Sequence, residues 1–201
     1  MRRKQFWFDT ETTGKNEWKQ DIIQLAGFIV IDDAIVDEFN WTCQPHKWDE
    51  IQDEALAVHG YGIEQLESFE SPLKVWNKLC RILDRHINKY DKEDKLEMCG
   101  FNTQFDVKFL KAWWSKCEQQ YFGSYFQHYK PFDVYPLAYM FADKYGWDLP
   151  DHKLITLAQF CDIEIDAHDA LSDIKATREL YLKFQQALPA DWSPNARTII
   201  G

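Results

Sequence analysis

The sequence lacks paired cysteines and long hydrophobic runs. Its five cysteines are widely spaced and form no Cys-x-x-Cys pair, which predicts reduced core thiols in a cytoplasmic protein rather than a disulfide framework. They are Cys43, Cys80, Cys99, Cys117 and Cys161. The longest apolar stretch, Leu25–Ile31, has the length of a strand and is too short for a membrane span. The apolar run after the basic start ends at Asp9, too early for a signal peptide, so we expect no membrane partner.

Positive charge is also scarce. The chain has 23 Lys and Arg against 33 Asp and Glu, which gives a net charge of -10. Because nucleic acids are bound mainly through Lys and Arg, this balance excludes a broad basic groove. It does not exclude a phosphodiester substrate, since divalent cations held by acidic side chains would cancel negative charge where the phosphate arrives. Apolar residues are abundant at 45%, with nine Trp, nine Tyr and fourteen Phe, which predicts one folded domain.

Alternating apolar and helical patterns predict a mixed α/β sheet with helices on its faces. The predicted strands are Gln5–Asp9, Ile22–Ile31, Ala34–Gln44, Leu96–Phe101 and a short buried strand at Phe132–Val134. The predicted helices are Ile63–Tyr90, Thr103–Cys117, Pro136–Tyr145, Leu154–Cys161 and Asp169–Gln186. Pro72 is expected to break the first of these helices near Ser71. A turn at Asp32-Asp33 makes the first three strands a meander, and the tail 188–201, with two prolines, is expected to be irregular.

The first chemically informative segment is Asp9-Thr10-Glu11-Thr12-Thr13-Gly14, which follows the first predicted strand. Asp9 and Glu11 are two positions apart, and such positions in a strand point to the same side. Two carboxylates on one side of a strand end, beside a glycine-containing turn, suit a hard cation. Taken alone, the pattern also fits a strand that runs into a capped loop.

The second segment, 102–106, follows a predicted strand and opens a helix. Either Asn102 or Thr103 fits the helix cap, and the helix dipole favours Asp106 in the first turn, so ordinary local chemistry explains this segment too. The functional interpretation adds that Asp106 faces the sheet end that holds Asp9, with Phe105 packed beneath it.

The third segment places His168 five positions before Asp173, with Asp169 positioned to cap the following helix. If His168 precedes the helix and Asp173 lies in its second turn, both side chains reach one cleft. A histidine accepts a proton near neutral pH and can serve as a general base. A surface histidine before an Asp-capped helix fits this single segment equally well.

Together and in this order, the three segments resemble the three motifs of the DEDDh (DnaQ-like) 3′–5′ exonucleases, which have a ribonuclease H-like fold. The five catalytic positions of that family match Asp9, Glu11, Asp106, His168 and Asp173. The stretch Asp53–Tyr61 resembles the family segment that ends in Val-His-Gly-Ile, with Tyr61 in place of the isoleucine. Phe132–Val134, with Leu137-Ala138, resembles the family's short strand and following helix. The resemblance runs from about residue 6 to about residue 182 and implies an exonuclease domain over residues 1–187.

The resemblance implies two divalent cations, Mg²⁺ or Mn²⁺, as cofactors. Asp9 would bridge the ions, while Glu11 and Asp173 would complete the site next to the attacking water. Asp106 would hold the second ion, and His168 would take a proton from the water. Without cations these carboxylates would repel one another, which independently favours a metal site.

We predict that substrate is bound by residues of the first segment and the loop after it, of the stretch Asp53–Tyr61 and of the second segment. These residues are Thr12, Thr13, Gly14, Lys15, Trp18, Val58, His59 and Asn102. In relatives, the segment with Val58 and His59 lies near the bound 3′ nucleotide. Lys15 and Trp18 lie in the loop after the first segment, where cations around an aromatic ring suit phosphate contact and base stacking. A solvated hairpin loop is the alternative for that region.

The sequence therefore predicts a metal-dependent 3′–5′ exonuclease that acts on the 3′ end of single-stranded nucleic acid and releases nucleoside 5′-monophosphates. The Asp-Thr-Glu-Thr-Thr-Gly form of the first segment is more like proofreading subunits, which favours DNA. The sequence leaves open whether the enzyme works alone or with a separate DNA polymerase as partner. An RNA-trimming or oligoribonucleotide-degrading enzyme of the same superfamily is the alternative. A non-catalytic nucleic-acid or polymerase-binding module is the alternative from another class, and the presence of all five catalytic residues argues against it.

Overall fold

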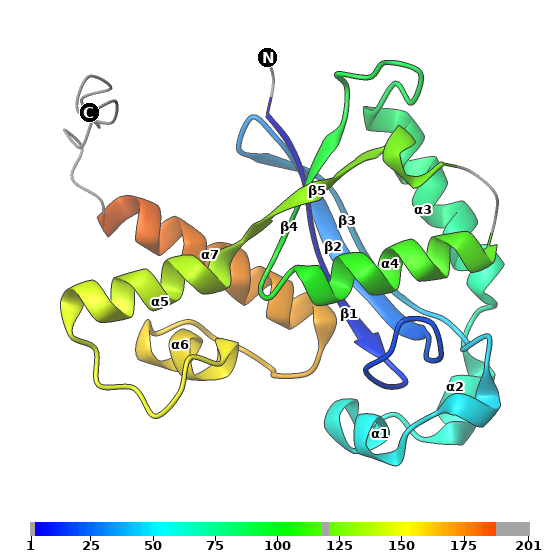
Figure 1. The fold of residues 1–201 in the computed structure, drawn as a ribbon, viewed down its shortest axis with the longest axis horizontal. Helices are drawn as coiled ribbons and strands as arrows, with labels where there is room; N and C mark the ends of the chain where they lie inside the picture. Colours follow the sequence, from blue (N-terminus) through cyan, green and yellow to red (C-terminus); the bar gives the residue numbers. More distant parts are fainter. Residues whose placement is uncertain (1–2, 118–120, 188–201) are drawn as a thin grey trace.

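The structure, a computed structural model, describes residues 3–117 and 121–187, so the tail predicted to be irregular lies outside the described residues. Five strands form one mixed sheet in the order β3-β2-β1-β4-β5 (Figure 1). The strands are β1 (Lys4–Thr12), β2 (Ile22–Ile31), β3 (Ala34–Thr42), β4 (Leu96–Gly100) and β5 (Phe126–Asp133). The first three pair antiparallel, whereas β4 pairs parallel with β1 and β5 pairs parallel with β4. The predicted α/β class, a meander followed by parallel strands, is confirmed.

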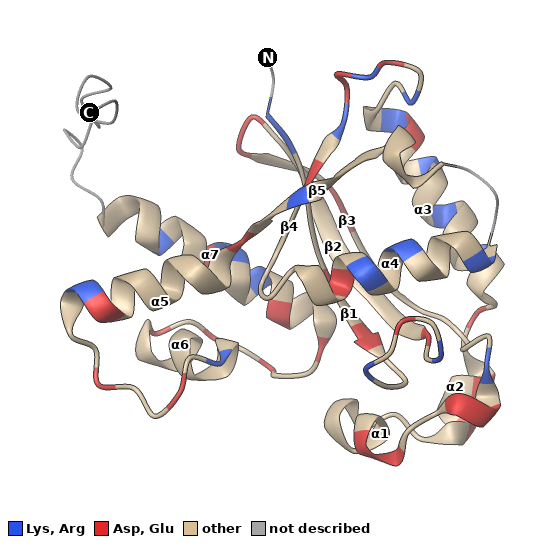
Figure 2. Cartoon of the chain, in the orientation of Figure 1, with Lys and Arg blue, Asp and Glu red and all other residues tan. Residues whose placement is uncertain are grey.

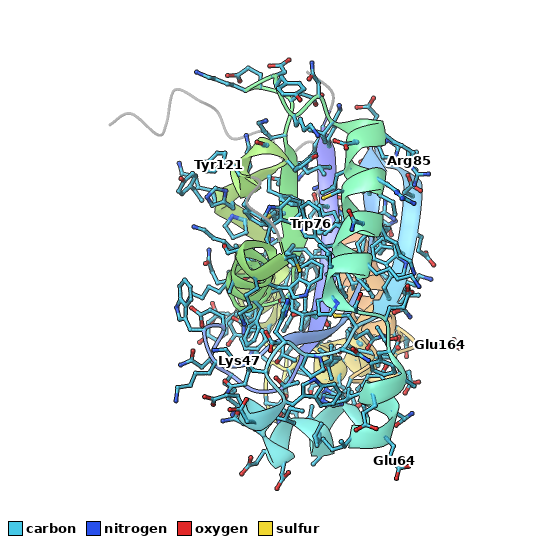
Figure 3. The ribbon with its side chains drawn as sticks, turned by 90° about the vertical axis from the view of Figure 1, so that its right-hand side faces the viewer. Lys47, Glu64, Trp76, Arg85, Tyr121 and Glu164 are labelled. Carbon is cyan, nitrogen blue, oxygen red and sulfur yellow. The ribbon has the colours of Figure 1, made fainter. Side chains whose placement is uncertain are left out.

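Helices cover both faces of the sheet, which gives three layers (Figure 1). They are α1 (Asp53–His59), α2 (Ile63–Ser68), α3 (Pro72–His86), α4 (Gln104–Cys117), α5 (Val134–Tyr145), α6 (Leu154–Phe160) and α7 (Ala170–Ala187). One apolar cluster joins the sheet to α3 and α4, and a second joins it to α5, α6 and α7. In the side view of Figure 3, Trp76 of α3 lies in the interior, where its ring meets Trp114 of α4 edge-on at 5.4 Å. None of the described helices combines the length and the apolar character that a membrane span requires.

The central strand β1 explains this layering. Successive side chains of a strand point to opposite faces. Phe6 and Phe8 therefore enter the cluster with α3 and α4, whereas Trp7 enters the cluster with α5–α7. All three side chains are fully buried, as expected for a strand with parallel and antiparallel neighbours and helices on both sides.

Several predicted boundaries differ from the structure. β1 continues to Thr12, so Asp9 and Glu11 lie within the strand rather than at and beyond its end. β5 begins at Phe126, six residues before the predicted start, and Val134 belongs to α5 rather than to the strand. The predicted helix 63–90 breaks near Ser71 as expected, because proline fits the first turn of a helix and not its interior: it divides into α2 and α3, and α3 begins at Pro72. The end of α3 at His86 comes four residues before the predicted end at Tyr90.

The parallel strands bring three carboxyl ends to the same edge of the sheet. β1, β4 and β5 run in the same direction, so their carboxyl ends meet at one edge, and α4 and α5 begin there. In open α/β sheets, ligands bind outside the carboxyl ends of strands where the strand order changes direction. Here that point is the crevice between β1 and β4.

Candidate active site

The candidate site lies at this carboxyl edge, where β1 ends between α4 and α7. Figure 2 shows acidic residues of these three elements close together. Asp9 and Glu11 lie two and four positions after Trp7 on β1. Their side chains therefore point to the same face of the sheet as Trp7, which is the face covered by α7. The side chain of Thr10 points to the other face of the sheet, which α4 covers. The alternation of one strand thus aims carboxylates at one helix and a hydroxyl at the other.

Asp106 occupies the first turn of α4, as predicted, and its carboxylate is bound to Thr10. Asp106 Oδ1 accepts hydrogen bonds from Thr10 N at 3.1 Å and from Thr10 Oγ1 at 2.7 Å. Burial raises the pKa of Asp106 to about 7, although the hydrogen bonds from Thr10 oppose this increase. These bonds fix the carboxylate beside β1 whatever its protonation state.

His168 and Asp173 are joined where α7 begins. His168 has a left-handed backbone with φ of 70°. This conformation is uncommon outside glycine, although asparagine, aspartate and histidine adopt it more often than other residues. Its backbone N–H donates to Asp173 Oδ2 at 3.3 Å. Asp169 caps the helix, as predicted, because its Oδ1 accepts from Ser172 N at 2.9 Å. The strained backbone is therefore held by the same carboxylate that belongs to the site.

The structure brings all five predicted catalytic residues together. Glu11, His168 and Asp173 offer ligand atoms that all lie within 4.8 Å of one another. Asp9 is close enough to the other carboxylates for their charges, after burial, to raise its pKa well above the usual range. Burial and then the charge of Asp173 raise the pKa of Glu11 to about 8. Burial is also the main reason that the pKa of Asp173 is raised, to about 6.

The donor set fits divalent cations. Asp173 Oδ1 is buried and accepts no hydrogen bond from any residue that the structure describes. A buried carboxylate oxygen without a partner is costly, and a bound cation would satisfy it. Carboxylate oxygens are also the ligands that Mg²⁺ and Mn²⁺ prefer. The residues present therefore suit the metals that the sequence predicted.

Without metal, the stability of the domain is expected to fall as the pH rises from about 4 to about 8. The pKa values of Glu11, Asp106 and Asp173 in the folded state, about 8, 7 and 6, lie above the values near 4 of an unfolded chain. The folded state then holds protons that the unfolded chain has lost, so raising the pH lowers the free energy of unfolding. Urea unfolding in EDTA at pH 5 and pH 8 measures this fall, which should be smaller in Asp106→Asn. Equal falls in both proteins would mean that these carboxylates do not form one cluster.

A small pocket of about 280 Å³ lies on the Glu11 side of the site. Five of the eight predicted substrate-binding residues line it: Thr12, Gly14, Lys15, Val58 and His59. Helix α1 forms one wall. A Cβ at Gly14 would lie 2.4 Å from Gln52 Oε1 and 2.5 Å from Gln20 Cγ, so a larger residue there would require these side chains to move. His59 Nε2 is buried and has no hydrogen-bond partner within the described part of the chain, which leaves a polar atom for a ligand.

A larger cleft of about 910 Å³ opens on the other side of the acids. Asp9, Asp106, His168 and Asp173 line one end of it, and Asn102 lies among its other lining residues. Thr10 and Phe105 line both the cleft and the small pocket, so the two spaces meet at the carboxylates.

Two predicted substrate-binding residues line neither space. Thr13 is fully buried, and its Oγ1 accepts from Asp21 N while its carbonyl accepts from Gln52 N, so it ties the loop after β1 to the start of α1. Trp18 is 70% exposed on that loop, away from both spaces. The structure thus gives Thr13 a supporting position and does not bring Trp18 to the site.

Gln24 is a site residue that the sequence analysis missed. Its side chain is buried on β2, opposite Glu11 of β1. Its Nε2 donates to Asp169 Oδ2 at 3.1 Å, and its Oε1 accepts from Tyr61 Oη at 3.3 Å. One amide therefore joins the cap of α7, next to His168, to the segment that follows α1. The available signal was a glutamine within an otherwise apolar strand.

The fold and the site define an α/β domain of the ribonuclease H-like kind with a carboxylate cluster at the carboxyl edge of its sheet. The RNase_T exonuclease family matches residues 6–181, and the chain belongs to this family. The predicted resemblance to DnaQ-like 3′–5′ exonucleases and the predicted enzyme class are confirmed.

The chain is also similar to one DNA polymerase sequence and to solved structures of Exonuclease I. The PolC-type DNA polymerase III of Caldanaerobacter subterraneus subsp. tengcongensis is 26% identical over 183 residues, which are 90% of this chain and 11% of the relative. Exonuclease I in its apo form has a TM-score of 0.71 at 16% identity, over 90% of this chain and 41% of that one. The zinc-bound E. coli Exonuclease I complex with single-stranded DNA has a TM-score of 0.73 at 17% identity, over 92% and 40% of the two chains. The chain thus spans about two fifths of these solved structures, which share its fold.

Proposed function

We propose that the domain is a metal-dependent 3′–5′ exonuclease that acts on single-stranded nucleic acid, with DNA preferred, and releases nucleoside 5′-monophosphates. The observation that carries this proposal is the position of the five catalytic residues between a small pocket and a much larger cleft. A pocket of about 280 Å³ has room for one nucleotide, whereas the cleft of about 910 Å³ has room for several more. This difference favours removal of one terminal nucleotide over cleavage within a strand.

In the proposed reaction, water attacks the phosphorus of the terminal phosphodiester. The bond from phosphorus to the 3′ oxygen breaks, which gives a nucleoside 5′-monophosphate and a strand with a new 3′ hydroxyl. His168 accepts the proton of the attacking water. Thr12, Val58 and His59 hold the terminal nucleotide in the small pocket.

Asp9, Glu11, Asp106 and Asp173 would hold two divalent cations. Such ions, when bound, make water more acidic and stabilise negative charge on a leaving oxygen. Thr10 keeps Asp106 in place through its two hydrogen bonds, and Asp169 keeps His168 at the start of α7 through the helix cap. The zinc-bound Exonuclease I complex supports a metal requirement.

The preference for DNA rests on the similar proteins and on the first segment. E. coli Exonuclease I has been solved with single-stranded DNA, including a dT13 oligonucleotide, and the PolC-type relative is a DNA polymerase. We include a separate DNA polymerase as a partner in the proposal on the same support.

The deciding experiment uses DNA and RNA single strands of the same sequence, labelled at either end, with Mg²⁺, Mn²⁺ or EDTA. We expect the 3′-labelled DNA to release a labelled mononucleotide at once and the 5′-labelled DNA to shorten stepwise, only with metal. Faster degradation of RNA would instead support an RNA-trimming enzyme. Binding without degradation would support a non-catalytic module, and release of a 5′ label first would contradict the polarity.

Mg²⁺ or Mn²⁺ is expected to raise the melting temperature of the wild type clearly more than that of Asp9→Asn. A cation that binds only the folded state stabilises it by mass action, and at a hundredfold excess over its Kd the gain is about 2.7 kcal/mol. A thermal melt with increasing metal measures the effect, with Asp143→Asn, a change of an exposed aspartate on α5, as the matched control. Equal increases in wild type and Asp9→Asn would show that Asp9 does not bind the cation.

A further inference from the structure

The larger cleft continues well beyond the catalytic residues. Past the acids it is lined by three aromatic or imidazole rings and one cation: Phe101, Tyr135, His152 and Lys153. Among the described lining residues, the only acids are Asp9, Asp106 and Asp173 at the catalytic end. In a chain with a net charge of -10, a cleft wall without further acids is distinctive. Tyr135, His152 and Lys153 line the cleft, and Tyr139 lies beside His152. We call these four residues the aromatic wall.

The rings of this wall are exposed on one face of α5. Tyr135 and Tyr139 are four positions apart and share a helix face, and they are 40% and 56% exposed. The opposite face of α5 is buried in the core through Ala138 and Phe141. Tyr139 lies 4.9 Å from His152, measured between ring centroids. Helix α5 therefore presents the ring of Tyr135 to the cleft and the ring of Tyr139 to solvent beside the cleft residue His152.

Hydrogen bonds hold both ends of the wall in place. Asp133 Oδ1 accepts from Asn102 N at 2.8 Å and from Tyr135 N at 3.0 Å, which fixes Tyr135 relative to the start of α4. At the other end, Asp151 Oδ1 accepts from Lys153 N at 3.0 Å. The backbone at Tyr135 and at Lys153 is therefore fixed before any ligand binds, which lowers part of the entropy cost of binding.

Lys153 is available for a phosphate. Its side chain is 76% exposed, and its Nζ lies 3.5 Å from Asp151 Oδ2. An ion pair this exposed contributes little, so a phosphate group can replace the carboxylate. One cation with several rings matches a single-stranded nucleic acid, whose bases stack on aromatic side chains without regard to sequence.

We propose that the aromatic wall binds the nucleotides on the 5′ side of the scissile bond. This inference rests on the proposed function, because it assigns the terminal nucleotide to the small pocket and the rest of the strand to the cleft. Bases of the upstream nucleotides stack on Tyr135 and Tyr139, and Lys153 contacts one backbone phosphate. The ligand is a single-stranded oligonucleotide of any sequence.

The test compares two substrates. The p-nitrophenyl ester of thymidine 5′-monophosphate offers a terminal nucleotide alone, whereas a ten-residue oligodeoxynucleotide also reaches the wall. The ratio of kcat/KM for the oligonucleotide to kcat/KM for the ester should fall at least tenfold in Tyr135→Ala/Tyr139→Ala, since stacking contributes roughly ten- to a hundredfold per base. It should be retained in Tyr135→Phe/Tyr139→Phe, which keeps the rings, and in Tyr90→Ala, which removes an exposed ring between α3 and β4.

Fluorescence anisotropy of the same oligonucleotide in EDTA gives a second measure that does not depend on catalysis. The alanine pair should weaken binding about tenfold or more, and Lys153→Gln should make the slope of log Kd against log salt shallower by about 0.7. A substrate ratio and an oligonucleotide Kd within twofold of the wild-type values in the alanine pair would overturn the inference. If the wild type hydrolysed neither substrate, the proposed function would fail, and the anisotropy result would still decide whether the wall binds single strands.

Discussion

Asparagine in place of Asp106 is expected to lower the rate of phosphodiester hydrolysis at least a hundredfold and to leave the fold intact. The new amide oxygen can still accept both hydrogen bonds from Thr10, so the start of α4 is preserved. What is lost is a buried negative charge next to Asp9, and metal-site charges contribute several kcal/mol to such reactions. Release of mononucleotide from a 3′-labelled single strand measures the rate.

The same variant should melt at a higher temperature than the wild type in EDTA above pH 7, because it removes one repelling charge from the cluster. Asp143→Asn, which changes an exposed aspartate, should affect neither the rate nor the melting temperature. Retention of more than about a tenth of the wild-type rate in Asp106→Asn would remove Asp106 from the metal site.

Replacement of His168 is expected to have the second large effect, a loss of about a hundred- to ten-thousandfold in rate, as for other general bases. The preferred variant is His168→Asn, because asparagine tolerates the left-handed backbone at this position, where φ is 70°. Release of mononucleotide from a 3′-labelled single strand with Mg²⁺ measures the loss.

His168→Ala provides the comparison for this experiment, because it removes the same imidazole with a side chain that fits the left-handed backbone less well. Metal should still raise the melting temperature of both variants, since the carboxylates remain. A variant with the wild-type rate would exclude His168 as the base.

The accuracy of the sequence analysis varied with the strength of each local pattern. β2 was predicted at its exact boundaries, because its apolar run is bounded by Asp21 and by the Asp32-Asp33 turn, where both residues have positive φ. α1 was missed because it buries none of its seven residues and so has no apolar periodicity. The start of β5 was missed because this edge strand carries exposed polar side chains and a proline.

For the candidate site too, residues in a strong local pattern were predicted and contacts between distant residues were not. The grouping of the five predicted catalytic residues could be expected, because the three segments that contain them form a known pattern. Asp9 and Glu11 share one side of a strand, and the other three lie where helices begin. The contacts that complete the site join residues far apart in the sequence: Gln24 and Asp169 are separated by 145 positions. Likewise, only the packing of α1 onto the loop after β1 defines the small pocket, and only the fold brings α5 and α6 to the cleft. A local sequence pattern cannot predict contacts between residues that lie so far apart in the chain.

The direction of β1 and α7 has a practical consequence. β1 begins at Lys4 and runs toward the catalytic edge, and α7 starts at that edge and runs back to Ala187. In Figure 1 the start of β1 and the far end of α7 accordingly lie away from the carboxyl end of β1 and the start of α4. A fluorescent reporter or a solid support joined at either end would therefore leave the cleft accessible. Single molecules of the domain can therefore be tethered to a surface to test whether they shorten a strand as proposed.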